Sequence, residues 1–288
     1  MQIFPRVIYQ VQYYFINIKG HTLTIKFIKK ILFLIYFPIS VFSQNTPEHD
    51  LIISVDRIWD RAEHNAFTSL ADFGNKLYCA FREGAGHVSD INGTIRVIAS
   101  DDNGQNWYSV AHLFEQGVDL RDPQLSITPD NRIMLNIGGS IYTAGKLEGM
   151  KPKVSFSDNK GRNFSIPQNI SIDESIRTNK DWLWKATWNN DICFATAYQP
   201  DKEKSVQLLR SNDGVNYKYV TTFEVTGGNE TTLSFMNDNS MVAIVRRKND
   251  QNGSIGISLP PYSEWNWNEL QAPLGGPNMI ILNDDLII

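Results

Sequence analysis

Residues 100–107 read SDDNGQNW, and close copies of this octet return twice along the chain. The second copy, SDNKGRNF, spans residues 157–164, and the third, SNDGVNYKY, begins at residue 211. In each copy an Asp or Asn side chain can accept backbone hydrogen bonds within a turn, and the Gly permits a positive φ. The aromatic residue that follows can fold back between two strands. We therefore expect a repeated structural turn, away from any active site, that is built from Ser100, Asp102, Gly104, Trp107, Ser157, Gly161, Phe164, Ser211, Asp213 and Gly214.

Each octet closes a longer repeat of short apolar runs. Three units that end in the octet start near residues 64, 120 and 182. A fourth unit, residues 229–267, keeps the apolar runs but carries SLPPYSEW in place of the octet, and a fifth begins at residue 274. The runs are rich in β-branched and aromatic residues and are separated by turn residues, which is typical of antiparallel strands. Units of about 45–60 residues built in this way predict the blades of a β-propeller.

The repeated octets on a β unit resemble the sialidase (neuraminidase) superfamily, in which they are called Asp boxes or BNR repeats. The resemblance covers about residues 54–288, within an expected propeller domain at residues 51–288, and implies an all-β fold, a six-bladed β-propeller of four-stranded antiparallel blades. This stretch is too short for six blades, so we expect a C-terminally incomplete propeller domain that lacks roughly the last one to two blades.

The resemblance also implies site residues. Residues 229–247, NETTLSFMNDNSMVAIVRR, are similar to the sialidase stretch in which a Glu is followed by a strand, a turn and a strand ending in Arg. Glu230 then takes the place of the Glu that activates a tyrosine nucleophile, and Arg246 that of one arginine in a three-arginine cluster for the substrate carboxylate. A structural interpretation stays open for both: Glu230 could cap the preceding loop, and Arg246 could be a solvated strand end.

A second segment, AFREGAGHVSD at residues 80–90, resembles the sialidase segment in which an Arg precedes the loop that carries the acid/base Asp. Arg82 matches that arginine, with a structural ion pair to Glu83 as the alternative. Asp90 matches the acid/base residue, and His87 competes with it because the loop does not align without a gap.

The chain also departs from the family pattern. Residues 64–67 read HNAF where sialidases have Arg-Ile-Pro, so the first arginine of the cluster is missing. The third arginine and the tyrosine nucleophile would lie downstream of residue 288. A different acidic or neutral glycan is therefore an alternative to sialic acid.

Four further residues are pocket candidates because of their place in the strand pattern. The starts of inner strands and the ends of second strands approach the centre of a propeller, and Arg121, Asp122, Lys185 and Trp182 fall at such places. The planar fork of an arginine binds carboxylates in a bidentate manner, and a tryptophan can stack on a sugar ring. The structural alternatives are a rigid turn at residues 121–123 and core packing for Trp182.

The N-terminus resembles an export signal. Lys26, Lys29 and Lys30 precede the apolar run ILFLIYFPISVFS at residues 31–43, a pattern that predicts cleavage before Gln44. The run is too short to span a bilayer comfortably. We expect residues 1–43 to be a leader and the mature chain to be exported without a stable membrane span, with an uncleaved anchor as the alternative.

The net charge of the chain argues against nucleic acid as a partner. The chain has a net charge of −4, and because its first 43 residues carry five basic and no acidic residues, the remainder carries −4 − 5 = −9. Such an acidic chain is a poor nucleic-acid binder, because phosphates require basic patches. Cys79 and Cys193 lie in apolar runs of separate repeats, so we expect buried free thiols. No spacing suggests a metal site, and no cofactor is expected.

The function predicted from these features is that of a secreted, sialidase-like glycoside hydrolase of the exo-α-sialidase type, acting on terminal acidic sugars of glycans or glycoconjugates. The expected chemistry is protonation of the leaving oxygen by a carboxylic acid while a nucleophile or water attacks the anomeric carbon. The alternative is a non-catalytic glycan-binding propeller or an inactive truncated homologue.

Overall fold

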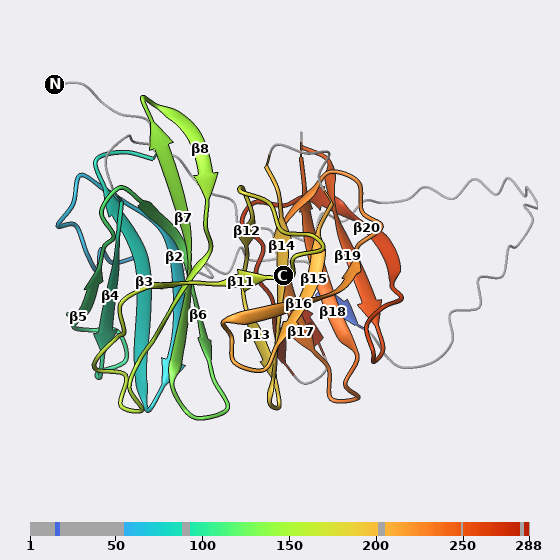
Figure 1. The fold of residues 1–288 in the computed structure, drawn as a ribbon. Coiled ribbons are helices and arrows are strands. Elements are labelled where there is room, and N and C mark those ends of the chain that lie inside the picture. Colours follow the sequence, from blue (N-terminus) through green and yellow to red (C-terminus); the bar gives the residue numbers. More distant parts are fainter. Residues whose placement is uncertain are drawn as a thin grey trace, which may run out of the picture.

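The computed structural model describes residues 15–17, 55–87, 93–200, 205–248, 250–282 and 285–287. All regular elements in these ranges are β-strands, which confirms the all-β class (Figure 1). Within the same ranges, no helix has the length and apolar character that a membrane crossing requires. The expected leader lies outside the described residues except for β1 (Phe15–Asn17).

Four sheets follow one another along the chain, and we name them blades 1 to 4 (Figure 1). Blade 1 contains β2 (His64–Phe73), β3 (Lys76–Gly84), β4 (Thr94–Ser100) and β5 (Tyr108–Leu113). Blade 2 contains β6 (Asp119–Ile127), β7 (Ile133–Thr143), β8 (Lys146–Met150), β9 (Lys153–Phe156) and β10 (Gln168–Asn169). Blade 3 contains β11 (Ser171–Ile172), β12 (Trp182–Leu183), β13 (Thr187–Asn189), β14 (Ile192–Tyr198), β15 (Gln207–Ser211) and β16 (Asn216–Thr222). Blade 4 contains β17 (Gly228–Phe235), β18 (Met241–Arg247), β19 (Asn252–Ser258) and β20 (Asn266–Pro273).

Within each blade the successive long strands pair antiparallel, as the alternation of apolar runs and turns predicts. Two additions depart from the simple pattern: β8 pairs only with β7, and the short β11 runs parallel to β16. After blade 4, β21 (Ile280–Leu282) pairs with β22 (Asp285–Ile287), which also pairs with β1. The described chain thus contains four blades of a β-propeller, and the count of six remains a prediction.

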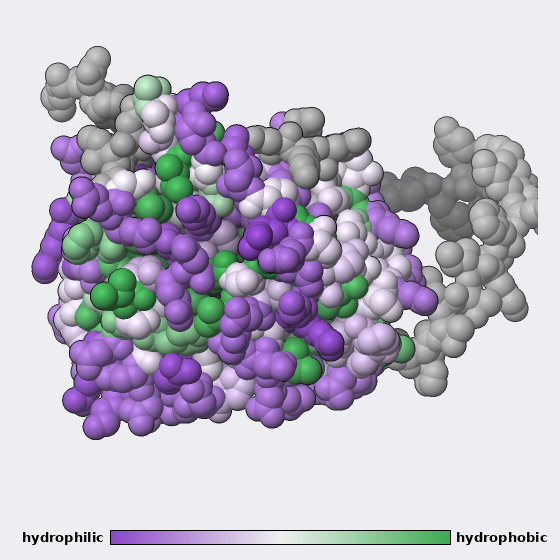
Figure 2. All heavy atoms as spheres, viewed as in Figure 1, coloured by the Kyte–Doolittle hydropathy of each residue, from purple (hydrophilic) through white to green (hydrophobic). Residues whose placement is uncertain are grey.

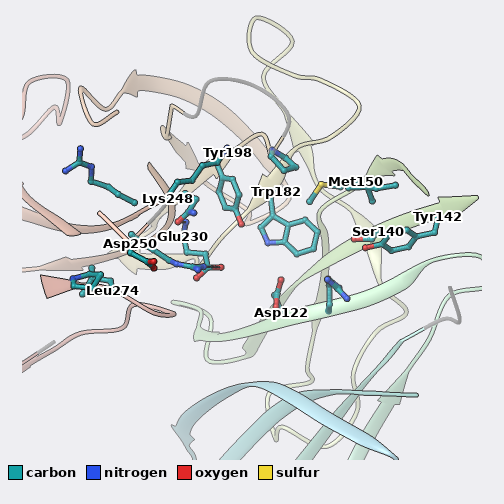
Figure 3. Close-up of a pocket in the computed structure, with 17 residues that line it drawn as sticks. Asp122, Ser140, Tyr142, Met150, Trp182, Tyr198, Glu230, Lys248, Asp250 and Leu274 are labelled. Atoms are coloured by element: carbon teal, nitrogen blue, oxygen red, sulfur yellow. Dashed lines mark hydrogen bonds and ion pairs between the residues drawn. The ribbon is translucent and has the colours of Figure 1, made fainter. Parts of the chain in front are cut away.

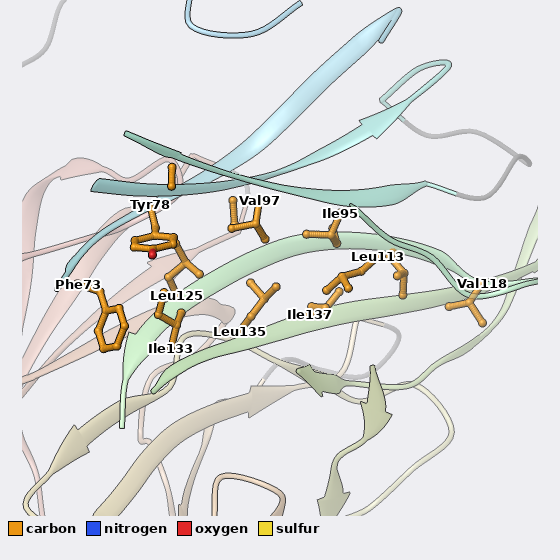
Figure 4. Close-up of a cluster of buried hydrophobic side chains, with 13 residues drawn as sticks. Phe73, Tyr78, Ile95, Val97, Leu113, Val118, Leu125, Ile133, Leu135 and Ile137 are labelled. Atoms are coloured by element: carbon orange, nitrogen blue, oxygen red, sulfur yellow. The ribbon is translucent and has the colours of Figure 1, made fainter. Parts of the chain in front are cut away.

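The blades are joined by hydrophobic clusters that two neighbours share. Between blades 1 and 2 the cluster includes Tyr78 and Val97 on one side and Leu125 and Ile133 on the other (Figure 4). Similar clusters join blade 2 to blade 3 and blade 3 to blade 4. Because the apolar face of each twisted sheet is covered by the next, the inner strands converge on one central region.

The repeated octets form the turns between the third and fourth strands. In the first, Ser100 Oγ accepts a hydrogen bond from Gly104 N (2.8 Å), and Asp102 Oδ1 accepts one from Asn106 N (2.8 Å). Trp107 Nε1 donates to Gly104 O at 2.9 Å and closes the turn. The glycines of the second and third octets sit against the preceding blade: a Cβ on Gly161, whose φ is +65°, would collide with Tyr78 Oη, and one on Gly214 would lie 2.9 Å from Met134 Sδ.

Blade 4 makes the same turn without the octet. Tyr262, with a φ of +68°, occupies the position that a glycine holds in the other turns, and Trp265 Nε1 donates to its carbonyl oxygen at 3.0 Å. The Tyr262 ring packs against Phe194 of blade 3 and Phe235 of blade 4. An aromatic side chain therefore replaces the close backbone approach that Gly161 makes in blade 2.

The outer surface is polar, and both thiols are inside. On the face shown in Figure 2, hydrophilic residues predominate and apolar residues form separate patches. Cys79 and Cys193 are free and buried, as expected from their apolar neighbours. Burial raises the pKa of the Cys79 thiol to about 11, so it stays protonated and unreactive at neutral pH.

Candidate active site

A pocket with a volume of about 430 Å³ lies where the inner strands of blades 2, 3 and 4 converge (Figure 3). Five of the residues that the sequence suggested line it: Arg121, Asp122, Trp182, Glu230 and Arg246. They come from positions up to 125 residues apart in the chain, 121 to 246. The convergence of the blades is what brings them together.

Local irregularities in the inner strands present two of the carboxylates. On β6 the register with β7 shifts between Arg121 and Gln124, and on β17 the register with β18 shifts between Gly228 and Thr231. At each place two residues oppose one on the partner strand, which is the pattern of a β-bulge. Asp122 lies in the first irregularity, with a φ of +48°, and Glu230 lies in the second. Bulges of this kind turn side chains away from the regular alternation of a strand and toward the pocket.

Glu230 is paired with a cation. Its Oε1 accepts a hydrogen bond from Arg246 Nη1 at 2.7 Å, and both side chains are partly exposed. A guanidinium at this distance favours the ionised carboxylate. Arg246 uses only Nη1 in this contact and lines the pocket, so its other N–H groups are potential donors to a ligand.

Asp122 has the opposite character. Burial raises its pKa to about 7, and the negative charges of Glu230 and Asp119 add to this rise, while Arg121 and Arg82 oppose it. Near neutral pH the Asp122 carboxyl therefore exists in both forms and can give up a proton. The pocket thus holds Asp122, which titrates near neutral pH, together with the carboxyl groups of Glu230 and Asp250.

Tyr198 also lines the pocket, at the end of β14, and its side chain was not singled out by the sequence. Burial raises the pKa of its phenol well above the ordinary value, and the charges of Glu230 and Asp122 raise it further. Tyr198 packs with Trp182 and Met150 in one buried cluster. The only signal in the sequence was its place at the end of a second strand.

Arg82 does not line the pocket. Its side chain is 0% exposed and binds Asp119, with Nε and Nη2 at 3.0 and 2.8 Å from Asp119 Oδ1. The alternative, an ion pair with Glu83, is not formed either, because Glu83 binds Arg96 on the other face of the blade. The burial keeps the Arg82 side chain out of this pocket, and its carboxylate-binding role stays a prediction.

Arg121 shares the same carboxylate. Its Nη2 lies 3.0 Å from Asp119 Oδ2, and it also donates to His87 O at 2.8 Å. Asp119 Oδ1 further accepts a hydrogen bond from Gly93 N at 2.9 Å. Asp119 therefore joins blade 2 to both ends of the segment between β3 and β4.

Of the two acid/base candidates in the segment between β3 and β4, the structure describes His87 but not Asp90. The exposed His87 has its ring centroid 5.0 Å from that of Phe67 and does not line the pocket. Asp90 lies outside the described residues.

Lys185 lies between β12 and β13, and its Nζ donates to Asn278 Oδ1 at 2.7 Å. It does not line the pocket, and burial lowers the pKa of its ammonium group. Asn278 belongs to the segment that borders Glu230: a Cβ on Gly276 would lie 3.9 Å from Glu230 Oε2. Lys185 therefore contacts the segment that borders Glu230 without lining the pocket itself.

In the described part of the chain, no group of three His, Cys, Asp or Glu side chains could hold a metal ion.

No protein-family model matches the chain, and no curated protein matches its sequence. Solved structures share its fold. A protein of unknown function from Dyadobacter fermentans superposes with a TM-score of 0.66 at 18% identity, over 78% of this chain and 74% of that one.

Several similar structures have names that state an activity, and two of them serve as examples. The NanB sialidase from Streptococcus pneumoniae gives a TM-score of 0.60 at 10% identity, over 75% of this chain and 54% of that one. A family 117 glycoside hydrolase from Zobellia galactanivorans gives 0.54 at 11% identity, over 70% of this chain and 68% of that one. The chain thus spans little more than half the length of the streptococcal sialidase. At these identities the likeness establishes a propeller fold of the kind found in sialidases and other glycoside hydrolases.

Proposed function

We propose that this chain is an exo-acting glycoside hydrolase that removes terminal sugars, with acidic sugars of the sialic-acid type as the first substrate class to test. One observation carries the proposal: Asp122, with a pKa of about 7, and the arginine-paired Glu230 line the same pocket. A carboxylic acid and a carboxylate in one pocket are the two groups that glycoside hydrolysis requires.

In the proposed reaction Asp122 gives its proton to the glycosidic oxygen as the bond from that oxygen to the anomeric carbon breaks. Glu230 takes a proton from the water that attacks the anomeric carbon, directly or through a neighbouring hydroxyl. The site then returns to its starting state when the proton passes from Glu230 to solvent and Asp122 is protonated again. Asp122 thereby fills the acid role that the resemblance to sialidases gave to Asp90.

The test is hydrolysis of a panel of 4-methylumbelliferyl glycosides: an α-sialoside, a β-glucuronide and a β-galactoside. Release of the fluorophore by the wild type and its loss in Glu230→Gln would support the proposal. Because 4-methylumbelliferone departs without a proton, the loss expected of Asp122→Asn is measured on an alkyl glycoside of the same sugar. Binding of a glycan without any release would support the alternative, a glycan-binding propeller, and would overturn the hydrolase.

Export belongs to the same proposal, because glycans of this kind are met outside the cell. The support is the basic and apolar pattern of residues 1–43. N-terminal sequencing of the protein recovered outside the cytoplasm should begin at Gln44, and recovery of the uncleaved chain in the cytoplasm would contradict export.

A further inference from the structure

The β7–β8 hairpin extends beyond the ends of its neighbours in blade 2, at the top of the view in Figure 1. It pairs Ser140 with Met150 and Tyr142 with Leu147, and a register shift lies between these two pairs. All four of these residues line the pocket. Ser140 and Tyr142 lie two positions apart on β7 and therefore share a face, and the extra residue in β8 places Leu147, rather than Glu148, opposite Tyr142.

The hairpin is fixed in place on its other side. Ile141 packs against the hydrophobic cluster that blades 1 and 2 share. At the hairpin base Met150 N donates to Asn179 O at 2.9 Å, and Lys151 N donates to Gly139 O at 2.8 Å. The pocket-facing residues therefore belong to a supported wall.

Trp182 and Tyr198 continue this wall into blade 3. The Trp182 ring lies directly against the β7 backbone, since a Cβ on Gly138 would be 2.2 Å from the ring. Any side chain at position 138 would displace the ring, so the glycine allows Trp182 to pack against β7 and line the pocket. The wall is apolar and aromatic throughout, apart from the hydroxyl groups of Ser140, Tyr142 and Tyr198 and the indole nitrogen of Trp182.

The pocket thus has two unlike sides (Figure 3). Ser140, Tyr142, Met150 and Trp182 lie on one side, and Glu230, Lys248, Asp250 and Leu274 lie on the other, with Asp122 below Trp182. A general acid must be next to the oxygen that it protonates, so the leaving group lies on the Asp122 side of the anomeric carbon.

We propose that the apolar wall of the β7–β8 hairpin is the subsite for the leaving group, and that it selects leaving groups with an apolar face, such as the C–H face of a sugar ring or an aryl group. The inference rests on the proposed hydrolase function. Tyr142 and Leu147 are the residues that determine this selectivity, because they face each other across the hairpin and both line the pocket. Stacking against an aromatic ring contributes enough to discriminate a ring-bearing leaving group from a small one.

The experiment compares benzyl and methyl α-glycosides of N-acetylneuraminic acid, two alkoxide leaving groups that differ in apolar area. The ratio of kcat/KM for benzyl over methyl should fall about fivefold in Tyr142→Ala and in Leu147→Ala, mainly through KM. Lys146→Ala is the matched control, since Lys146 lies in the same hairpin, is 80% exposed and does not line the pocket. Its ratio should equal that of the wild type.

An unchanged ratio in both hairpin variants would overturn the subsite. If a variant unfolds, Leu147→Met and Tyr142→Phe keep the wall and should keep the ratio, and loss of the ratio there would count against the assignment. If the wild type cleaves neither glycoside, the hydrolase proposal fails in this substrate class, and the inference is decided by titrating the same two compounds. Tighter binding of the benzyl compound that disappears in Leu147→Ala supports the subsite, and equal or absent binding overturns it.

Discussion

Arg246 Nη1 donates a hydrogen bond to Glu230 Oε1 at 2.7 Å, at the place where the register between β17 and β18 shifts. The Arg246 side chain is 38% exposed and that of Glu230 is 19% exposed, so the pair borders solvent. Ion pairs that are this accessible stabilise a fold only weakly. The place of the pair in the pocket therefore points to a role toward a ligand.

Replacing Glu230 by Gln should abolish most turnover and leave the fold intact. We expect kcat to fall at least ~100-fold, because a side chain that transfers a proton typically contributes ~10²–10⁴-fold. The Tm should stay within about 4 °C of the wild type, since a change of ~1 kcal/mol moves the Tm of a large domain by only a few degrees. Both quantities are measured on one preparation with the glycoside that the panel identifies.

Glu269→Gln is the matched control for this variant. Glu269 also pairs with an arginine of β18, Arg247, at 2.9 Å, but does not line the pocket. Its turnover should be that of the wild type. A large loss of stability with normal turnover in Glu230→Gln would make Glu230 a structural residue.

Activity should decrease on the alkaline side with an apparent pKa near 7, because the acid must be protonated. Burial raises the pKa of Asp122 to about 7, so the protonated form dominates below that pH and is lost above it. A profile of kcat/KM between pH 4 and 9 measures this limb. In Asp122→Asn the residual activity should be low and should lack the limb, and an unchanged limb in that variant would assign the titration to another group.

The same shift predicts how stability depends on pH. The pKa of Asp122 is about 7 in the folded chain against an ordinary value of 3.8, so the folded state binds the proton more tightly. The stabilisation that this proton provides is complete below pH 4 and is lost as the pH rises to 7. Urea denaturation should show Asp122→Asn gaining stability relative to the wild type over this interval. A constant difference between the two proteins would contradict the raised pKa.

The blades could be predicted from the sequence because their signal is local and repeated. Alternating apolar runs and a turn octet at regular spacing give strands of the right order in blades 1 to 3. The turn of blade 4 has no octet, yet its Trp265–Tyr262 hydrogen bond closes the same geometry. The repeat thus survives in the structure where the sequence signature is lost.

The pocket was predicted only in part, for physical reasons. Glu230 and Arg246 fall in a recognisable segment. The raised pKa values of Asp122 and Tyr198, by contrast, come from burial and from the nearby charge of Glu230. Whether an arginine faces the pocket or the core depends on the carboxylate with which it pairs, and Arg82 pairs with Asp119, 37 residues away in the sequence. Strand periodicity does not reveal such long-range pairing or the register shifts that aim side chains.

Removing the charge of Asp119 should destabilise the protein severely. Its carboxylate is 2% exposed, and Asp119→Asn would leave the buried Arg82 guanidinium without a counter-charge. Breaking a buried ion pair on one side costs ~3–5 kcal/mol, and urea denaturation would measure it. Asp101→Asn is the control, because its pair with Lys76, at 3.4 Å, is exposed and should contribute little. A loss for Asp119→Asn as small as that of the control would contradict the structural role of Arg82.

The octet glycines should differ from an ordinary turn glycine. Gly161 and Gly74 both have positive φ, +65° and +59°, but a Cβ at Gly161 would meet Tyr78 of blade 1, whereas nothing lies within 4 Å at Gly74. We expect Gly74→Ala to cost ~1 kcal/mol from backbone strain alone. Gly161→Ala should cost at least ~2 kcal/mol, because the neighbouring blade must also shift. Equal costs in denaturation experiments would show that the octet does not determine the contact between blades.

An acidic sugar needs a cation in the pocket that can bind its acid group. Three of its arginines are already bound to carboxylates: Arg121 to Asp119, Arg246 to Glu230 and Arg247 to Glu269. Lys248 also lines the pocket, and among the described residues it has no acidic partner. It directly follows the last residue of β18, two positions after Arg246, and both side chains line the pocket.

Lys248→Met should therefore weaken action on an acidic sugar and spare a neutral one. We expect kcat/KM for the α-sialoside or β-glucuronide to fall about tenfold, the equivalent of ~1.4 kcal/mol, as for loss of one charge-assisted contact. The β-galactoside should change less than about twofold, and Lys248→Arg should restore most of the loss because it keeps the charge. Lys160→Met, an exposed lysine in the second octet, controls for net charge and should have no effect. Equal losses on acidic and neutral glycosides would exclude Lys248 as the receptor of the acid group and would favour a neutral sugar as the substrate.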